Sequence, residues 1–376
     1  MEATKTRIDN IGIDVSLLGF GCMRFPTIDG KIDEVLAEKM LDEAYAAGIN
    51  YYDTAFPYHN GDSEPFVGRI MSKYERASYY LATKLPTWNV ANMDDAKRIF
   101  ELQRSRIDGN YIDFYLIHAL NRGSWIKMRD LGVVEYLKDM KVEGKIKYLG
   151  FSFHDDYEVF EEIINYTDWD FCQIQLNYMD TDEQAGMKGY KLAESKNIPL
   201  VIMEPIKGGL LANLPKEVTK PFDELDPAKT TASWALRWVA SLPNVKVVLS
   251  GMSDYEQVMD NLDTFCDFKE LSEEENEAVA KVGEALRKRV NNGCTGCRYC
   301  MPCPAGVNIP KNFAIWNRFG IYGNEGDAKW QWNNEITETE KAKNCIKCGK
   351  CEGVCPQKLQ IRDDLACLQS CFDSIN

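Results

Sequence analysis

The sequence predicts an α/β fold in which a (β/α)₈ barrel of the TIM type is followed by a small cysteine-rich helical domain. Two observations lead to this prediction. Eight short apolar runs, each followed by a helical pattern, alternate over about 250 residues, which is the usual length of such a barrel. Of the 13 cysteines, only Cys22, Cys172 and Cys266 precede residue 290. We therefore expect a barrel over residues 1–270, a linker over 271–292 and the cysteine-rich domain over 293–376.

The expected elements follow in chain order. After a hairpin over 7–16, barrel strands are expected over 17–21, 50–54, 79–85, 113–118, 147–152, 171–177, 199–205 and 245–250. Helices are expected over 33–47, 63–74, 94–107, 133–142, 155–165, 184–196, 228–241 and 254–265. A charged amphipathic helix over 271–290 forms the linker. An open doubly wound sheet is the alternative, but no Gly-x-Gly-x-x-Gly opens a helix after the first strand.

Charge and hydropathy exclude some classes of partner. The formal net charge is −14, whereas phosphate contacts with a nucleic acid need a basic face. No apolar run approaches the roughly 20 residues of a membrane helix. The first ten residues carry no apolar run typical of a signal peptide. We therefore expect a cytoplasmic protein that binds neither nucleic acid nor a membrane.

Four titratable side chains stand at or just after the ends of successive expected strands. Asp53 ends the second strand, with Tyr58 in the loop behind it; Lys84 and His118 end the next two. A single such residue is more often structural, but the carboxyl ends of barrel strands form the catalytic face. An ammonium beside a tyrosine favours the phenolate and lowers its pKa. Together these groups suit proton transfer to a carbonyl oxygen during hydride delivery.

The same stretches resemble the aldo/keto reductase family, whose members are (β/α)₈ barrels that reduce carbonyls with a nicotinamide cofactor. The resemblance covers roughly residues 5–265. It rests on Asp53-Thr54-Ala55 with Tyr58, on Ser63-Glu64 with Gly68, on Ala82-Thr83-Lys84 and on Leu116-Ile117-His118. It implies that Tyr58 is the general acid, that Lys84 and Asp53 support it, and that His118 orients the carbonyl.

The resemblance also implies a set of cofactor contacts. Besides Asp53, these are Gly21, Cys22, Met23, Ser152, Gln173, Met203, Pro205, Ile206, Gly208, Ser250, Gly251, Gln257 and Asn261. Two departures leave the choice between NAD(H) and NADP(H) open. Phe153 stands where the family has a carboxamide-binding asparagine. Gly251 and Gln257 stand where the family has basic residues for the 2′-phosphate of NADPH, and a phosphate without such a residue loses its charged partner.

Four further residues are candidates for the walls of the substrate pocket. His59 and His154 flank its expected mouth, and each is equally suited to capping a loop. Trp88 and Trp125 are placed in the loops after the third and fourth strands, where large aromatic side chains are typical of substrate contacts. The expected substrate is a small carbonyl compound or alcohol, and the sequence does not specify it further.

The cysteine-rich domain contains two similar motifs. Cys345, Cys348, Cys351 and Cys355, followed by Pro356, form the full bacterial ferredoxin run for a [4Fe–4S] cluster. Cys294, Cys297, Cys300 and Cys303, followed by Pro304, form the same run one residue short. In two-cluster ferredoxins, the fourth cysteine of each run binds the other cluster. By that resemblance, one cluster takes Cys294, Cys297, Cys300 and Cys355, and the other takes Cys345, Cys348, Cys351 and Cys303.

Two alternatives accompany this reading of the cysteines. Two Cys₄ zinc sites are disfavoured, because zinc ribbons use separated pairs rather than tight runs followed by proline. About forty residues separate the runs, and a helical pattern over 311–319 resembles α-helical ferredoxin modules of larger oxidoreductases. Cys367 and Cys371 share a face of an expected terminal helix and are more typical of packing than of ligation.

The whole chain therefore resembles the branch of aldo/keto reductases that carries a C-terminal ferredoxin-type domain. The first functional hypothesis is a nicotinamide-dependent oxidoreductase with two [4Fe–4S] clusters linked to a ferredoxin-like or other redox protein. A nicotinamide passes two electrons as a hydride whereas a cluster takes one, and no flavin motif supplies a bridge. The alternative is a redox-sensing or scaffold protein whose barrel binds nucleotide without turnover.

Overall fold

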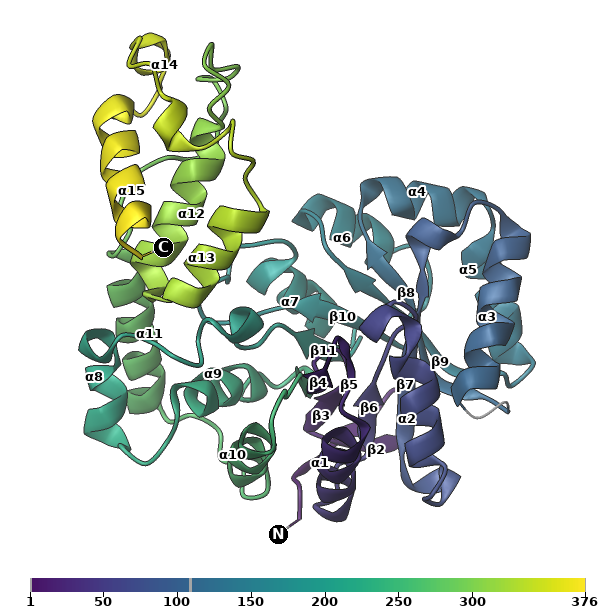
Figure 1. The fold of residues 1–376 in the computed structure, drawn as a ribbon. Helices are drawn as coiled ribbons and strands as arrows, with labels where there is room; N and C mark the ends of the chain where they lie inside the picture. The colour runs from purple at the N-terminus through teal and green to yellow at the C-terminus, as the bar shows by residue number, and fades with distance from the viewer. Residues whose placement is uncertain (1, 108–109, 376) are drawn as a thin grey trace. The chain divides into compact units, whose positions relative to one another are not determined.

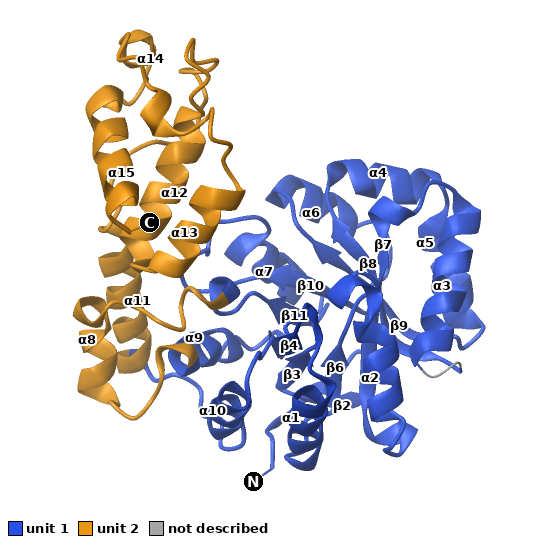
Figure 2. Cartoon of the chain, in the orientation of Figure 1, with its two compact units in different colours: residues 1–208, 233–273 blue, residues 209–232, 274–376 orange. Residues whose placement is uncertain are grey.

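The structure, a computed structural model, describes residues 2–107 and 110–375. Residues 1 and 376, the outer ends of the expected domains, lie outside the described residues. The chain forms two compact units (Figure 2): one contains residues up to Gly208 with Ser233–Glu273, the other Gly209–Ala232 with the residues from Glu274 onward. Within the described ranges, we find no helix with the length and hydropathy required to cross a membrane.

The first unit contains a closed barrel of eight parallel strands (Figure 1). The strands are β3 (Leu18–Gly21), β6 (Tyr51–Asp53), β7 (Tyr80–Pro86), β8 (Ile112–Leu120), β9 (Ile146–Phe153), β10 (Phe171–Gln175), β11 (Leu200–Met203) and β12 (Val245–Ser250). Each strand pairs with its neighbours in chain order, and β12 pairs with β3 to close the ring. The predicted barrel is confirmed, and the open-sheet alternative is wrong.

Helices alternate with the strands around the barrel. Those expected from the sequence are α1 (Glu34–Ala46), α2 (Ser63–Met71), α3 (Met93–Ile107), α5 (Val133–Val142), α6 (Tyr157–Ile164), α7 (Gly186–Ser195), α9 (Thr231–Ala240) and α10 (Tyr255–Phe265). One further helix, α4 (Arg122–Asp130), was expected to be a loop. It begins with a capping box, because the Asn121 and Ser124 side chains each accept the other residue's backbone N–H.

Two hairpins accompany the barrel. The antiparallel strands β1 (Lys5–Ile8) and β2 (Ile13–Ser16) form the predicted N-terminal hairpin, and Ile8 and Val15 join the apolar cluster inside the barrel. Strands β4 (Thr27–Ile28) and β5 (Lys31–Ile32) form a second, short hairpin after β3.

The pleat of the strands explains where polar side chains enter the barrel. The interior cluster includes Tyr51, Ala82, Leu116, Phe171 and Val201, one from each of five strands. Successive side chains alternate between the faces of a strand, so the residue two positions later points to the same interior. At the carboxyl ends, these next inward positions are Asp53, Lys84, His118, Gln173 and Met203. Four of these five side chains are polar, so the barrel changes from an apolar core to a mainly polar floor within one layer of side chains.

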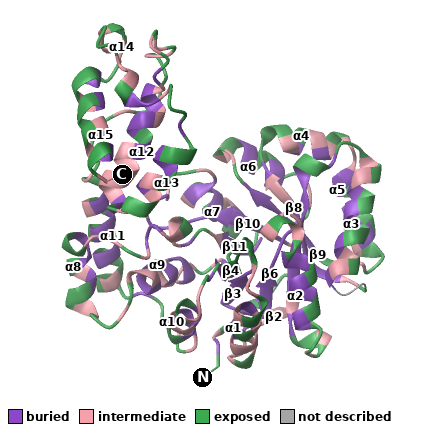
Figure 3. Ribbon diagram, in the orientation of Figure 1, coloured by how far each residue is buried: buried purple, intermediate pink, exposed green. Residues whose placement is uncertain are grey.

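The second unit is helical. Its elements are α8 (Lys216–Leu225), α11 (Glu273–Arg287), α12 (Ile309–Tyr322), α13 (Glu325–Asn334), α14 (Lys350–Gly353) and α15 (Ile361–Ile375). Helix α11 is the predicted linker helix, and α8 lies where a loop was expected. Helices α12, α13 and α15 enclose a small core in which the rings of Trp332 and Phe372 stack with centroids 4.3 Å apart. The cysteine loops and α14, at one end of the unit, are largely exposed (Figure 3).

Candidate active site and cysteine cavities

Lys84 is the centre of the predicted group of four. Its ammonium is fully buried and donates to Asp53 Oδ1 at 2.5 Å and to the Thr54 carbonyl at 2.8 Å. It also lies against Tyr58, whose ring centroid is 5.0 Å from Nζ. The Tyr58 and His118 rings meet edge to face, with centroids 6.2 Å apart. The structure thus brings all four side chains together.

Burial determines the protonation of this group. It raises the pKa of Tyr58 above its ordinary value, and the Lys84 ammonium opposes that rise only in part. Burial lowers the pKa of His118 well below its ordinary value, and the nearby Lys84 charge lowers it further. For Lys84 itself, burial acts to lower the pKa, but Asp53 and Tyr58 raise it by more. Near neutral pH, the site therefore holds a neutral phenol, a neutral imidazole and an ammonium.

The loops behind these residues contain unusual backbone conformations. His59 and Asn60, directly after Tyr58, have φ of 51° and 56°, and Ala119, directly after His118, has φ of 51°. Non-glycine residues in this left-handed region are strained and cluster at functional sites. The Ser152 hydroxyl accepts the Ala119 N–H at 2.8 Å. Ser152, expected to contact the cofactor, therefore also fixes the backbone beside His118.

Several residues of the expected cofactor cleft lie where two backbones approach closely. A Cβ added to Gly21 would lie 3.1 Å from the Ser250 carbonyl oxygen and 3.2 Å from the Gly251 nitrogen, so a larger residue would force these backbones apart by a few tenths of an ångström. Cys22 is buried, whereas the neighbouring Met23 is 55% exposed. Gln173 Oε1 is buried without a hydrogen-bond partner among the described residues. Since buried amide oxygens normally accept a hydrogen bond, this atom suits the amino group of a nicotinamide carboxamide.

The residues expected at the adenosine end already interact with one another. Asn261 donates to the Ser250 hydroxyl at 2.8 Å, and both are buried. Gln257 is exposed; its backbone N–H donates to Asp254 at the start of α10, and its side chain donates to the same carboxylate. Its amide is thus part of a helix cap, so it offers a cofactor phosphate no positive charge.

The loop after β11 is held by a partly buried ion pair that the sequence did not reveal. Met203 ends β11, and Pro205, Ile206 and Gly208 follow in the loop. Between them, Glu204 and Lys207 adopt left-handed conformations with φ of 54° and 50°. Lys207 donates to both oxygens of Asp180 at 2.6 and 2.5 Å, and Asp180 is 6% exposed. This pair fixes the loop that the family resemblance assigns to the cofactor pyrophosphate.

Arg24 is a second feature that sequence reasoning missed. A Cβ added to Gly251 would lie 2.9 Å from Arg24 Cγ, and one added to Gly208 would lie 3.9 Å from Arg24 Nη2. The exposed Arg24 side chain therefore lies over Gly251 and extends toward Gly208. A cation is present beside the cleft although neither Gly251 nor Gln257 supplies one.

The candidate pocket residues take different positions. Trp88 is 55% exposed and its ring centroid lies 5.0 Å from that of His118. His59 packs against Phe25 with centroids 5.7 Å apart, and His154 is exposed at the end of β9. The loop placement of Trp125 is wrong.

Trp125 instead lies in α4 and is fully buried. Its indole N–H donates to Glu162 Oε1 at 2.8 Å, and its ring meets Tyr166 edge to face. Glu162 lies in α6 and Tyr166 lies two residues after it. Trp125 therefore packs α4 against α6 and does not project from a loop.

The eight motif cysteines of the second unit surround two cavities. The larger, of about 190 Å³, is lined by Cys300, Cys303, Cys345, Cys348 and Cys351. The smaller, of about 20 Å³, is lined by Cys294, Cys297, Cys300 and Cys355. Among the described residues, no three or more His, Cys, Asp or Glu side chains lie close enough together to hold a single metal ion. Each cavity thus collects the first three cysteines of one run and the fourth of the other, and Cys300 lines both cavities.

The two runs share their local geometry. The third position of each run has positive φ, 70° at Gly296 and 56° at Lys347, and so does the fifth, 64° at Arg298 and 76° at Gly349. In each run, the backbone N–H of the third position donates to the first cysteine Sγ at 3.4 Å. The runs are therefore structural repeats that wrap their thiols in the same way. Hydrogen bonds to sulfur are one means by which a protein tunes an iron–sulfur cluster.

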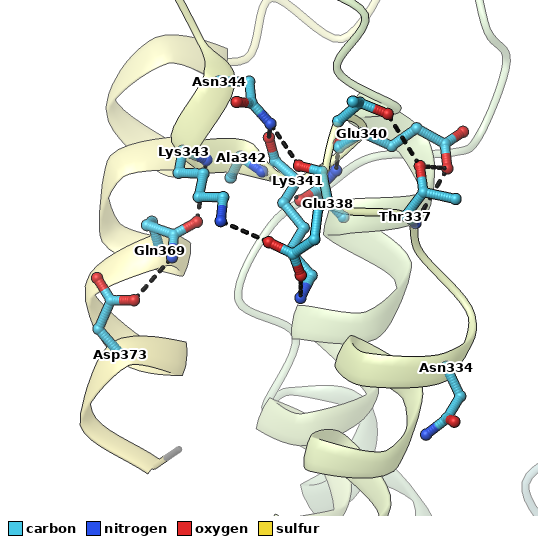
Figure 4. A network of polar contacts seen from close by, with 12 residues as sticks. Asn334, Thr337, Glu338, Glu340, Lys341, Ala342, Lys343, Asn344, Gln369 and Asp373 are labelled. Carbon is cyan, nitrogen blue, oxygen red and sulfur yellow. Dashed lines mark hydrogen bonds and ion pairs between the residues drawn. The ribbon is translucent and has the colours of Figure 1, made fainter.

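A polar network fixes the segment that leads into Cys345 (Figure 4). The Glu338 carboxylate accepts hydrogen bonds from Lys341 and Lys343, which lower its pKa to about 2. The Lys343 backbone N–H donates to Gln369 on α15 at 2.9 Å. The second run consequently starts from a segment that is tied to α15.

Comparison with known proteins decides the family. Residues 17–284 match the family model described as "Aldo/keto reductase family", and residues 293–359 match the model described as "4Fe-4S dicluster domain". The chain belongs to the aldo/keto reductase family. It is an oxidoreductase of that family with an iron–sulfur domain after the barrel, and the second match favours iron–sulfur ligation over zinc.

Individual relatives agree with this assignment. An uncharacterized oxidoreductase of Bacillus subtilis (strain 168) is 27% identical over 73% of this chain and 95% of its own length. The NADH-specific methylglyoxal reductase of Escherichia coli (strain K12) is 24% identical over 70% of this chain and 91% of its own. The holo form of aldo-keto reductase AKR11C1 from Bacillus halodurans superposes with a TM-score of 0.64 at 26% identity, covering 75% of this chain and 96% of that one.

Proposed function

We propose that this aldo/keto reductase reduces a small carbonyl compound, or oxidises the corresponding alcohol, with a nicotinamide cofactor. Tyr58 acts as the general acid and base. The observation that supports this most strongly is the contact of Tyr58 with a fully buried ammonium, that of Lys84, within a barrel mouth that also presents a neutral His118. A bound reduced nicotinamide would supply the hydride.

The protein's own residues would manage the proton. In the direction of reduction, Tyr58 donates its phenolic proton to the carbonyl oxygen, which becomes the alcohol oxygen. Lys84 stabilises the phenolate that remains, and Asp53 holds Lys84 through the 2.5 Å contact. His118, kept neutral by burial, donates a hydrogen bond that orients the carbonyl. Gln173 binds the carboxamide through its unpartnered oxygen.

We further propose two [4Fe–4S] clusters in the second unit. The smaller cavity supports a cluster bound by Cys294, Cys297, Cys300 and Cys355. The larger supports one bound by Cys345, Cys348, Cys351 and Cys303. When bound, each would exchange one electron at a time with a redox partner. No described residue pattern suggests a flavin site.

A pair of tyrosine variants tests the proposed acid. Tyr58→Phe should bind NADH, monitored by nucleotide fluorescence, but lose carbonyl reduction by about 100-fold or more, the usual contribution of a general acid. Tyr51→Phe is the matched control, because it removes a buried hydroxyl that has no described hydrogen-bond partner. Methylglyoxal, named for the Escherichia coli relative, is the first substrate to try. Equal turnover of both variants would contradict the role of Tyr58.

A further inference from the structure

Three large apolar side chains are exposed around the larger cysteine cavity. Tyr299, Ile346 and Val354 are 69%, 66% and 53% exposed, and all three line that cavity. Large apolar residues that gather on one exposed face commonly mark an interaction site. These side chains also belong to the loops that carry the cysteines, so a partner seated on them would lie directly beside the proposed clusters.

The same face is basic, although the chain is acidic. Charged residues lining either cavity are Arg298, Lys350 and Arg362, and no described carboxylate lines them. Arg362 is paired with Glu352 at 2.8 Å. Arg298 and Lys350 are exposed and form no ion pair with a described residue, and the same holds for Lys347, next to Cys348. Against a net charge of −14 for the chain, this face is a local concentration of unpaired cations.

One cysteine of each set reaches the surface at this face. Cys297, of the smaller cavity, and Cys348, of the larger, are exposed, whereas the other six motif cysteines are partly buried. In Figure 1 the loop before α12 and α14 lie at the same end of the second unit. A carrier on this face would therefore meet the least shielded thiolate of each proposed cluster.

We propose that this apolar and basic face, formed by Arg298, Tyr299, Ile346, Lys347, Lys350 and Val354, docks an acidic one-electron carrier protein. The inference rests on the two clusters of the proposed function. Each encounter moves one electron from the reduced carrier to an oxidised cluster, or one electron back. No bond is formed or broken and no proton is transferred. Complementary charge steers such an encounter and gives it a strong dependence on ionic strength.

A charge-matched pair of double variants tests the face in the full-length, cluster-loaded protein. Lys347→Asn with Lys350→Glu makes the face more negative by three charges, and asparagine tolerates the left-handed backbone at position 347. The control, Lys281→Asn in α11 with Lys288→Glu directly after it, makes the same change in charge away from the cysteine loops of the second unit. The probes are a plant-type [2Fe–2S] ferredoxin, which is acidic, and cytochrome c, which is basic.

Binding is measured by calorimetry, and association by stopped-flow, at roughly 0.01 M and 1 M ionic strength, where the Debye length is about 30 and 3 Å. We expect ferredoxin to bind the native protein at low salt. The face variant should lose about tenfold or more in association rate, while the control changes by less than about twofold. An equal loss of association rate in the face variant and the control would overturn the docking face. So would a native protein that does not bind ferredoxin, or one that binds cytochrome c more tightly than ferredoxin. Visible absorption of each preparation monitors the clusters separately, and its absence from native protein would overturn the cluster assignment itself.

Discussion

The proposed clusters can be bound crosswise, with the fourth cysteine of each run on the other cluster, or in sequence order. The two arrangements predict opposite effects of removing Cys303 or Cys355. Cys355 lines the smaller cavity with Cys294, Cys297 and Cys300, and Cys303 lines only the larger. Each fourth cysteine should therefore bind the cluster of the other run. If ligation instead followed sequence order, the two fourth cysteines would exchange roles.

The perturbation starts from a background that retains one cluster. Cys345→Ala with Cys348→Ala removes two of four ligands from the larger cavity, so iron should fall from about eight atoms per chain to about four. In this background, adding Cys355→Ala should remove a ligand of the remaining cluster and bring iron toward zero. Adding Cys303→Ala should leave about four. Alanine is used because serine oxygen can replace a thiolate as a ligand.

The assay combines iron and acid-labile sulfide analysis with visible absorption of anaerobically purified protein. Circular dichroism of the helical unit checks that each variant is folded. Crosswise ligation is refuted if Cys303→Ala empties the remaining site while Cys355→Ala leaves it intact. Loss of the remaining cluster in both variants would also contradict the pairing in this background. The reciprocal background, Cys294→Ala with Cys297→Ala, repeats the test with the roles exchanged: there Cys303→Ala should empty the remaining site and Cys355→Ala should leave it intact.

Three further predictions concern the barrel. Arg24→Gln should weaken NADPH and NADH binding equally if Arg24 contacts the shared pyrophosphate, or NADPH alone if it contacts the 2′-phosphate; unchanged affinity for both, measured by fluorescence titration, would remove Arg24 from the cofactor site. Ser152→Ala should lower kcat by about threefold to tenfold, since roughly 0.5–1.5 kcal/mol of hydrogen bonding that fixes Ala119 is lost, and Ser195→Ala, an exposed hydroxyl, is its control. The kcat/KM for reduction should be flat from about pH 6 to pH 9: Tyr58 must be protonated to act as the acid, and burial raises its pKa above the ordinary value of about 10, while burial keeps His118 neutral. An inflection near pH 6.5 that His118→Gln abolishes would contradict a neutral imidazole at His118 over this range.

The position of the proposed active site was largely predictable from the sequence. Asp53, Lys84 and His118 end apolar runs, and the alternating pleat of a strand requires their side chains to enter the interior that Tyr51, Ala82 and Leu116 fill one layer below. The inward direction of the side chain at each strand end could thus be predicted without knowing which strand lies beside it.

Features that depend on contacts between distant segments could not be predicted. Arg24 lies over Gly251, and Asp180 binds Lys207, although nothing in their local sequence identifies these partners. Trp125 was misplaced because the helix that contains it buries only two residues, too few for a periodic apolar pattern. The sign of the Tyr58 pKa shift also needed the structure: the sequence placed an ammonium beside the phenol, but burial outweighs that charge.

The proposed reaction is direct hydride transfer in the barrel, and it can be tested by following deuterium from the cofactor into the product. The protein is supplied anaerobically with NADH deuterated at the transferred C4 position and with the carbonyl compound that it reduces fastest. The alcohol is then analysed by mass spectrometry. Direct transfer predicts one deuterium on the former carbonyl carbon, with the hydroxyl proton coming from water through Tyr58. An alcohol without deuterium on that carbon would mean that the electrons reach the substrate by another route, such as the clusters, and would contradict hydride transfer in the barrel.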